Sequence, residues 1–535
     1  MFFNKLKKNL KRIKIPQNIK FSLIIISIAF LYNFQSIIKY PPYSTHRWRQ
    51  ADAYSITLNY YEEGMGFFEP KMHFQGSIEG RGVGEFPIIY FLNACIWKIT
   101  SPNYITFRLI NLIIVFLGLL CLFKTALFIL KDFFWACAIP LILISSPLFA
   151  YYSNNFLVNV PALSFIFIAW YFLTLFSSGK KMRYLWFSVV FMALSFLLRP
   201  SMIIAVTPVF LLLFLELFGL LKSNIFYKKT IHLPVLLLPV VISIAWILFS
   251  KHYNEVNNSE YFLTTIRPSW KAENVEHIWS QFYNVILPVF HFPGMLFIIT
   301  TLLIGMMVTW KKQNKYFLIF TLTLSLELIF YIMLWFENLD VHDYYLIELF
   351  LIIAPLFIGF LLFLKNENPH IFYSKKIKIL VFIVLLFFTY SCAIKVRIKY
   401  NVDHPIFGTH IVLSEEEIKY WEYIKWDNDT RYKAYETVTP YIRSLGINRK
   451  DIVVSITDPS PNISLSLMDQ KGFTSLYYTD MSEDERIRMF IQRGAKYLFI
   501  NDPKLYENPK LADFTKNKIG QFMNIDIYDL RGVRF

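Results

Sequence analysis

The chain has 535 residues, of which 55% are apolar and 19% aromatic, and its mean hydropathy is +0.42. An ordinary soluble core cannot bury that much apolar surface, so the composition excludes a soluble globular enzyme and predicts a polytopic α-helical membrane protein. The net charge of +16 comes from Lys and Arg clusters between apolar runs. This pattern is typical of cytoplasmic loops and argues against a nucleic-acid-binding surface.

The apolar runs predict about eleven transmembrane helices, the first of them an uncleaved signal-anchor behind a basic patch that begins at Lys5. One shorter apolar segment, residues 87–99, contains Asn93 and Lys98 and is predicted to lie along the membrane surface. As a span it would turn every later basic cluster outward, against the positive-inside rule. The predicted spans lie near residues 21–38, 104–123, 133–150, 160–177, 184–198, 201–221, 231–250, 288–310, 316–336, 344–364 and 378–395.

This layout puts the N-terminus in the cytoplasm and everything after Lys395 outside. The outer face then receives a long first loop at about residues 39–103, a corner at Arg199-Pro200 and the start of the tenth span at His342. An Arg between two apolar runs is costly unless it meets an anion, although a snorkelling side chain is an equal alternative for Arg199. Glu348 lies near a span end, where contact with water is expected.

The first outer loop opens with THRWRQADAY, residues 45–54. A cap at Ser44 or Thr45 and a helix end at Gly64 predict about five helical turns along the membrane. Arg49 and Asp52 fall on one face of this helix, and the alternative is a surface ion pair of little energetic value. Glu85 follows in GVGEFP, where alone it would be an ordinary loop glutamate.

The composition changes at about residue 396, so we predict a membrane domain over 1–395 and a small α/β domain over 396–535. Helical patterns alternate there with short buried strands such as DIVVSI and KYLFIND. Ser482 and Glu485 have capping-box spacing, and Gly494 is a candidate helix end. The loop Asp458-Pro459-Ser460-Pro461-Asn462 is a candidate acceptor contact, although turn chemistry explains it equally well.

The segments RWRQADAY, NYYEEG, GEFPIIYFLNACIWKI, FRLINLI and VHDYYLIELF resemble, in order and spacing, the polyprenyl-phosphate-sugar-dependent membrane glycosyltransferases of the GT-C fold. The nearest group contains protein O-mannosyltransferases and the lipid A aminoarabinose transferase. The resemblance spans about residues 20–395 and implies two juxtamembrane helices in the first outer loop. It matches the catalytic acid to Asp52 and a second acid to Glu85. Phe86 departs from the Lys or Pro of relatives, so no phosphate-binding role is transferred to that position.

The resemblance implies transfer of a hexosyl or pentosyl unit from a polyprenyl phosphate to an acceptor, and direct displacement with one base predicts inversion at C1. The donor already has a good leaving group, so the enzyme needs a general base, for which Asp52 is the candidate, and cations for the phosphate. Arg49 and Arg199 are the predicted phosphate-binding residues. His342, Asp343 and Tyr345 are predicted donor or metal contacts, with membrane-interface tyrosines as the alternative for the last. Glu85 and His342 are weak candidates for a divalent ion, and no cofactor is certain.

The expected partners are a lipid-linked sugar donor, an acceptor glycan, lipid or protein, and membrane lipids, with no nucleic acid. The expected location is a bacterial plasma membrane with the active face and the C-terminal domain toward the periplasm or exterior, and an endomembrane is the alternative. A transporter or flippase of lipid-linked sugars would also be polytopic. Its usual repeats, broken helices and midplane charges are not evident, whereas acids and aromatics concentrate in one outer loop. A membrane anchor for the C-terminal domain would leave that loop unexplained.

Overall fold

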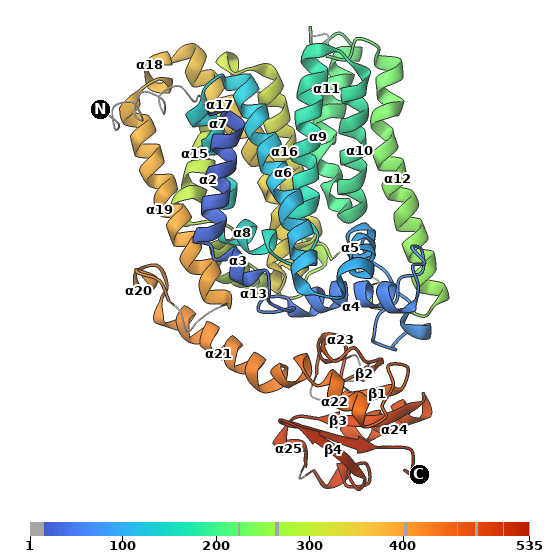
Figure 1. Ribbon diagram of the computed structural model, residues 1–535. Helices are drawn as coiled ribbons and strands as arrows, with labels where there is room; N and C mark the ends of the chain where they lie inside the picture. Colours follow the sequence, from blue (N-terminus) through green and yellow to red (C-terminus); the bar gives the residue numbers. More distant parts are fainter. Residues whose placement is uncertain are drawn as a thin grey trace, which may run out of the picture.

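The computed structural model describes residues 15–222, 225–259, 261–262, 267–400, 405–456, 458–476, 480–506 and 508–533. Long helices form a bundle, helix α4 runs across one end of it, and an α/β domain lies beyond α4 (Figure 1). Most of the basic patch that begins at Lys5 lies outside the described residues.

The bundle is built from helices that follow the chain up to Tyr400. In order they are α2 (Gln17–Leu31), α3 (Phe34–Ile37), α4 (Arg47–Glu63), η1 (Ile78–Gly80), α5 (Ile88–Thr100), α6 (Tyr104–Leu130), α7 (Phe133–Ile144), α8 (Pro147–Ser153), α9 (Asn159–Gly179), α10 (Met182–Leu198), η2 (Pro200–Ala205), α11 (Thr207–Leu217), α12 (Lys229–Val256), η3 (Ser269–Lys271), α13 (Val275–Gln281), η4 (Phe282–Ile286), α14 (Leu287–Phe290), α15 (Pro293–Val308), η5 (Trp310–Lys312), α16 (Lys315–Leu334), η6 (Phe336–Asp340), η7 (Asp343–Ile352), α17 (Ile353–Glu367), α18 (Pro369–Phe372) and α19 (Lys375–Tyr400).

The number of membrane spans differs from the predicted eleven. Among the described residues, seven helices are long and apolar enough to cross a membrane, or up to nine if each of two bent pairs is one span. Helices α2 and α10 coincide with two further predicted spans but have only 15 and 17 residues. At 1.5 Å per residue they are shorter than a hydrocarbon layer of about 30 Å. The count of eleven is therefore not confirmed.

Two predicted spans are broken in the structure. The segment predicted at 133–150 bends by 79° between α7 and α8, and the one at 288–310 contains a bend of 92° between the helices on either side of His291. Ser146 caps α8 by accepting a bond from the backbone N–H of Phe149, and prolines occupy the first turns of α8 and α15. A proline at a helix start fits a new helix better than a continuing one, which explains both breaks.

The basic turns gather at the end of the bundle away from α4 (Figure 1). Lys378 pairs with Asp132 at 2.6 Å, and Lys180 donates to the backbone carbonyl of Ile225 at 3.3 Å. These contacts join turns that are far apart in sequence at this end of the bundle. At the other end, α5 occupies the segment predicted to be interfacial, so the first loop supplies two short helices, as the resemblance implied.

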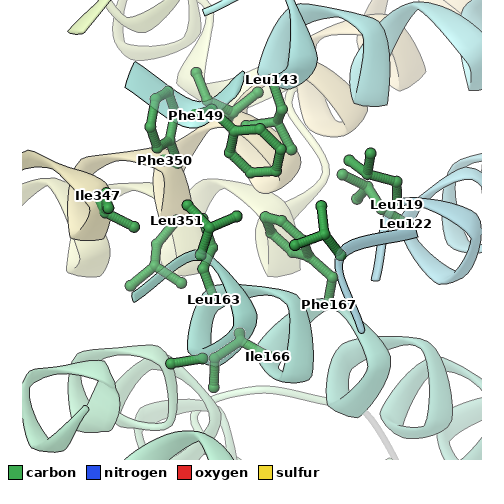
Figure 2. Packing of buried hydrophobic residues seen from close by; sticks show 14 of the residues in the cluster. Leu119, Leu122, Leu143, Phe149, Leu163, Ile166, Phe167, Ile347, Phe350 and Leu351 are labelled. Carbon is green, nitrogen blue, oxygen red and sulfur yellow. The ribbon is translucent and has the colours of Figure 1, made fainter. Parts of the chain in front are cut away.

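The core of the bundle is apolar and positions the segment that carries His342 and Asp343. Figure 2 shows Leu119, Leu163, Phe167, Phe149 and Phe350 meeting at the centre of α6, α8, α9 and η7. All five side chains are buried. Segment η7 is therefore held on several sides by tightly packed side chains, which gives the residues at its start a fixed position.

The C-terminal part has a five-stranded sheet in the order β2-β1-β3-β5-β4, with parallel pairs among β1, β2 and β3 and antiparallel pairs at β5. The predicted capping box of Ser482 and Glu485 is present, and Gly494 follows the helix with a φ of 95°. The small α/β domain is thus confirmed, whereas its boundary at 395/396 stays a prediction. Its elements are α20 (Thr409–Val412), α21 (Glu415–Arg431), η8 (Lys433–Glu436), α22 (Thr439–Ser444), β1 (Ile452–Ile456), α23 (Ile463–Leu467), β2 (Gly472–Thr474), α24 (Glu483–Gln492), β3 (Ala495–Ile500), α25 (Pro503–Tyr506), η9 (Pro509–Leu511), β4 (Lys518–Phe522) and β5 (Ile525–Asp529).

Candidate active site

Buried polar side chains fix the start of α4. Arg108 is fully buried and donates to the backbone carbonyls of Tyr40 at 3.1 Å and Pro41 at 3.0 Å. The Gln50 amide donates to the carbonyls of Tyr43 at 2.7 Å and Thr45 at 2.9 Å. The chain after the first helix is therefore pinned at several carbonyl groups, and α4 has a defined direction across the bundle end.

The predicted cap of α4 is wrong. The residue before the helix is His46, with a φ of 52° and no capping bond from its side chain, rather than Ser44 or Thr45. The corner before the helix is held instead by the Arg108 and Gln50 bonds to backbone carbonyls. The predicted end at Gly64 is confirmed, because Gly64 has a φ of 102°, which favours glycine.

One guanidinium joins the two predicted catalytic acids. Arg49 approaches Asp52 Oδ2 with Nη1 at 3.1 Å and Glu85 Oε2 with Nη2 at 2.9 Å. Glu85 also accepts a hydrogen bond from the Tyr90 hydroxyl. The Asp52 carboxylate is 2% exposed, so the pair is not the surface ion pair considered as the alternative. The structure thus brings three predicted site residues together.

The surroundings shift the pKa values of Asp52 and Glu85 in opposite directions. Burial raises the pKa of Asp52 above its ordinary value, although Arg49, Tyr261 and Asn462 each favour the ionised form. Burial acts in the same way on Glu85, but the Arg49 charge and the Tyr90 hydroxyl outweigh it, so the pKa of Glu85 is lowered. Two nearby acids with divergent proton affinity are a frequent feature of catalytic sites.

Two residues that sequence reasoning did not connect with Asp52 complete its hydrogen bonds. The Tyr261 hydroxyl donates to Oδ2 at 2.6 Å, and the Asn462 amide donates to Oδ1 at 2.8 Å. Asn462 lies in the loop that the sequence analysis gave as a candidate acceptor contact. The sequence therefore marked this loop, but it did not indicate that Asn462 bonds to Asp52. Nothing in the sequence marks Tyr261.

The start of η7 forms a second polar group. Asp343 accepts a bond of 2.5 Å from the Tyr152 hydroxyl and lies 3.1 Å from Nε2 of His46. The rings of His46 and His342 lie 5.4 Å apart. Burial lowers the pKa of His342 to about 4, and the charges of His46 and Arg49 act in the same direction. His342 is therefore neutral near pH 7 and close enough to Arg49 to feel its charge.

The anion that meets Arg199 comes from the protein itself. Arg199 Nε donates to Glu348 Oε1 at 2.6 Å, and its guanidinium lies 4.6 Å from the centre of the Tyr345 ring. Glu348 is fully buried, so its expected contact with water is wrong. Each charge compensates the other inside an apolar bundle, so that loss of one partner would leave the other as an uncompensated buried charge. A phosphate-binding role for Arg199 stays a prediction.

The sequence offered two candidate metal ligands, Glu85 and His342. The described part of the chain contains no group of three His, Cys, Asp or Glu side chains that could hold a metal ion. The carboxylate of Glu85 is engaged by Arg49 and Tyr90. These residues do not fit a metal site, and we assign no step of the reaction to a metal. Phe86, where relatives differ, packs its ring against Phe67 and Trp246.

No protein-family model matches the chain, and no curated protein matches its sequence. Solved structures do match in fold. ArnT from Cupriavidus metallidurans bound to undecaprenyl phosphate is 9% identical with a TM-score of 0.57, over 96% of this chain and 98% of that one. The Archaeoglobus fulgidus oligosaccharyltransferase is 10% identical with a TM-score of 0.53, over 91% and 69% of the two chains. Arabinofuranosyltransferase AftD from Mycobacteria is 10% identical with a TM-score of 0.50, over 95% and 39%.

These solved structures are membrane glycosyltransferases with the GT-C fold, and this chain has the same fold. The chain is similar to ArnT over nearly the whole length of both proteins, including the C-terminal domain. At this level of identity the likeness shows the architecture alone.

Proposed function

We propose that this protein is an inverting glycosyltransferase that transfers a sugar from a polyprenyl phosphate to an acceptor hydroxyl or phosphate on the outer face of the membrane. The observation that carries the proposal is the buried Asp52 carboxylate, joined to Glu85 by the single guanidinium of Arg49 in a GT-C fold. The solved ArnT complex holds undecaprenyl phosphate, which supports a polyprenyl-phosphate donor here.

Asp52 is the general base in this proposal. The acceptor oxygen attacks C1 of the sugar while its proton passes to the carboxylate, and the bond from C1 to the carrier phosphate breaks. In the structure the Tyr261 phenol donates to Oδ2 of Asp52, which is where an acceptor hydroxyl would have to place its proton. Burial supports the role, because a raised pKa makes a carboxylate a better proton acceptor.

The departing phosphate needs positive charge, and Arg49 and Arg199 are the proposed sources. Arg49 keeps the second acid, Glu85, ionised and paired, so that Glu85 orients the guanidinium. Arg199, Tyr345 and His342 would contact the donor headgroup. One base and no covalent intermediate predict inversion at C1, in contrast to retaining enzymes with a nucleophile and an acid.

The test is transfer by the purified protein in liposomes with a labelled polyprenyl-phosphate sugar and no ion gradient. Asp52→Asn should abolish label transfer, while Asp132→Asn, a carboxylate at the opposite end of the bundle, should keep it. Product anomers read by NMR should be inverted relative to the donor. Full transfer by Asp52→Asn would refute the role of Asp52 as the general base. Movement of the lipid across the bilayer without any turnover would favour a flippase instead.

A further inference from the structure

The loop before α23 in the C-terminal domain places Asn462 against Asp52. Its amide nitrogen donates to Oδ1 at 2.8 Å, although the two residues are 410 positions apart in the chain. Asn462 is fully buried and Asp52 nearly so. A contact of this kind between a charged acceptor and a neutral donor, away from water, is worth more than an exposed one.

The orientation of the amide is set by a second contact. The backbone N–H of Phe74 donates to Oδ1 of Asn462 at 2.9 Å, and the Ser55 hydroxyl lies 3.4 Å from the same atom. The carbonyl end of the amide is therefore the acceptor, and the NH₂ end must face Asp52. The assignment of the two ends follows from the network rather than from their shape.

Neighbouring side chains leave Asn462 available for this contact. An Asn at the residue before a helix normally caps it by accepting from the first backbone N–H groups. Here Ser460 Oγ accepts from the N–H of Ile463 at 2.9 Å, and Asp458 accepts from that of Ser464 at 2.8 Å. Asp458 also accepts from the hydroxyls of both serines, at 2.6 Å each. The turn is closed without Asn462.

Ionic contacts hold the loop against α4. Glu63 at the end of α4 lies 2.6 Å from both Arg449 and Lys471 of the C-terminal domain. The backbone of the first outer loop also pairs with β2, because Gln75 donates to the carbonyl of Gly472 at 2.8 Å. The position of Asn462 relative to Asp52 is thus fixed by contacts that do not involve either residue.

We propose that Asn462 is a positioning residue of the active site, through which the C-terminal domain holds Oδ1 of Asp52 and so fixes the orientation of the carboxylate. This inference rests on the proposed function, in which Asp52 is the base. Arg49 and Tyr261 both donate to Oδ2, and among the described residues Asn462 is the side chain that donates to the other oxygen.

The test uses two variants of the full-length protein in liposomes. Asn462→Asp keeps an acceptor for the Phe74 N–H but loses the donor, and Asn462→Leu removes both at similar volume. For both we expect kcat to fall about 10- to 100-fold with little change in the KM of the lipid donor. The acid limb of the rate profile should move to higher pH, since the ionised form of Asp52 loses a hydrogen bond while Arg49, Tyr261 and Glu85 stay in place. Asn462→Asp should move it further, because a second carboxylate then faces the first.

Asn501→Ala is the matched control, because it removes a buried amide of the same domain that bonds to the Arg431 carbonyl and does not touch Asp52. It should keep the wild-type pH profile. If Asp52→Asn stops transfer while both Asn462 variants keep the wild-type kcat and acid limb, this inference fails and the proposed function stands. If Asp52→Asn transfers normally, both fail. A loss of rate in the Asn462 variants without any shift of the acid limb means a structural role only and also overturns the inference.

Discussion

Arg49 makes two buried acids compatible within one site. Its planar guanidinium offers separate N–H groups to Asp52 and to Glu85, with both oxygens of Glu85 within 3.1 Å. A carboxylate without such a partner would take up a proton on burial. The Arg49 charge therefore keeps Asp52 able to ionise, while burial keeps it more basic than an exposed carboxylate.

Arg49→Lys tests this arrangement at the residue scale. A single ammonium cannot bond to both carboxylates in the same geometry, so we expect kcat/KM to fall at least about tenfold. The acid limb of the pH–rate profile should move to higher pH, because an ammonium that cannot bond to both carboxylates favours the ionised form of Asp52 less. Steady-state rates between pH 5 and 8 measure both effects.

Arg183→Lys is the control, because Arg183 is exposed and lies in a basic turn away from α4. It should match the wild type at every pH. A wild-type rate for Arg49→Lys would show that charge alone suffices and that the forked contact to Asp52 and Glu85 has no role.

At the scale of elements, the pair of Arg199 and Glu348 joins the α10–η2 corner to η7. Arg199→Met leaves Glu348 as an uncompensated buried charge, which costs roughly 3–5 kcal/mol of stability. The double variant Arg199→Met with Glu348→Leu should recover most of that loss, since apolar replacements of a buried pair are often neutral. Thermal unfolding midpoints in detergent measure this.

The same double variant separates stability from function. If Arg199 stabilises the departing phosphate as proposed, the double variant folds but transfers little sugar. Glu348→Gln should retain more transfer than the double variant, because the cation is still present. A stable double variant that transfers at the wild-type rate contradicts the phosphate role of Arg199.

Local patterns predicted much of the fold, and contacts distant in sequence account for what was missed. The apolar length of residues 87–99 predicted α5, and the three-residue spacing predicted the contact of Arg49 with Asp52. The breaks near Ser146 and His291 were missed because an apolar run with a proline fits a kinked span or two helices equally well. The contacts of Tyr261 and Asn462 with Asp52 depend on how remote segments pack, which no local pattern encodes.

At the scale of the whole molecule, the C-terminal domain closes over α4 through a buried polar cluster. His73 of the first outer loop is fully buried, with Nδ1 at 2.8 Å from the Ser55 hydroxyl and Nε2 at 3.0 Å from Asp469. Arg449 lies 3.3 Å from Nε2 and 2.8 Å from Asp469. The loop, the helix and the domain therefore share one network, which makes their association sensitive to the charge of His73.

Acid should loosen this association. Burial lowers the pKa of His73, and the charges of Arg449 and Lys471 act in the same direction against the opposing contact with Asp469. The free pKa of histidine is about 6.5. A histidine whose pKa is lowered on burial stabilises the docked state fully at pH values above that free pKa, and the stabilisation is lost as the pH falls toward the lowered pKa. Amide hydrogen exchange in residues 472–475 should therefore be less protected at pH 5.5 than at pH 7.5, after correction for intrinsic rates. His73→Gln should lose this dependence, and His277→Gln, an exposed histidine on α13, should keep it. Equal protection of the wild type at both pH values, or an unchanged dependence in His73→Gln, would show that His73 does not control the docking of the domain.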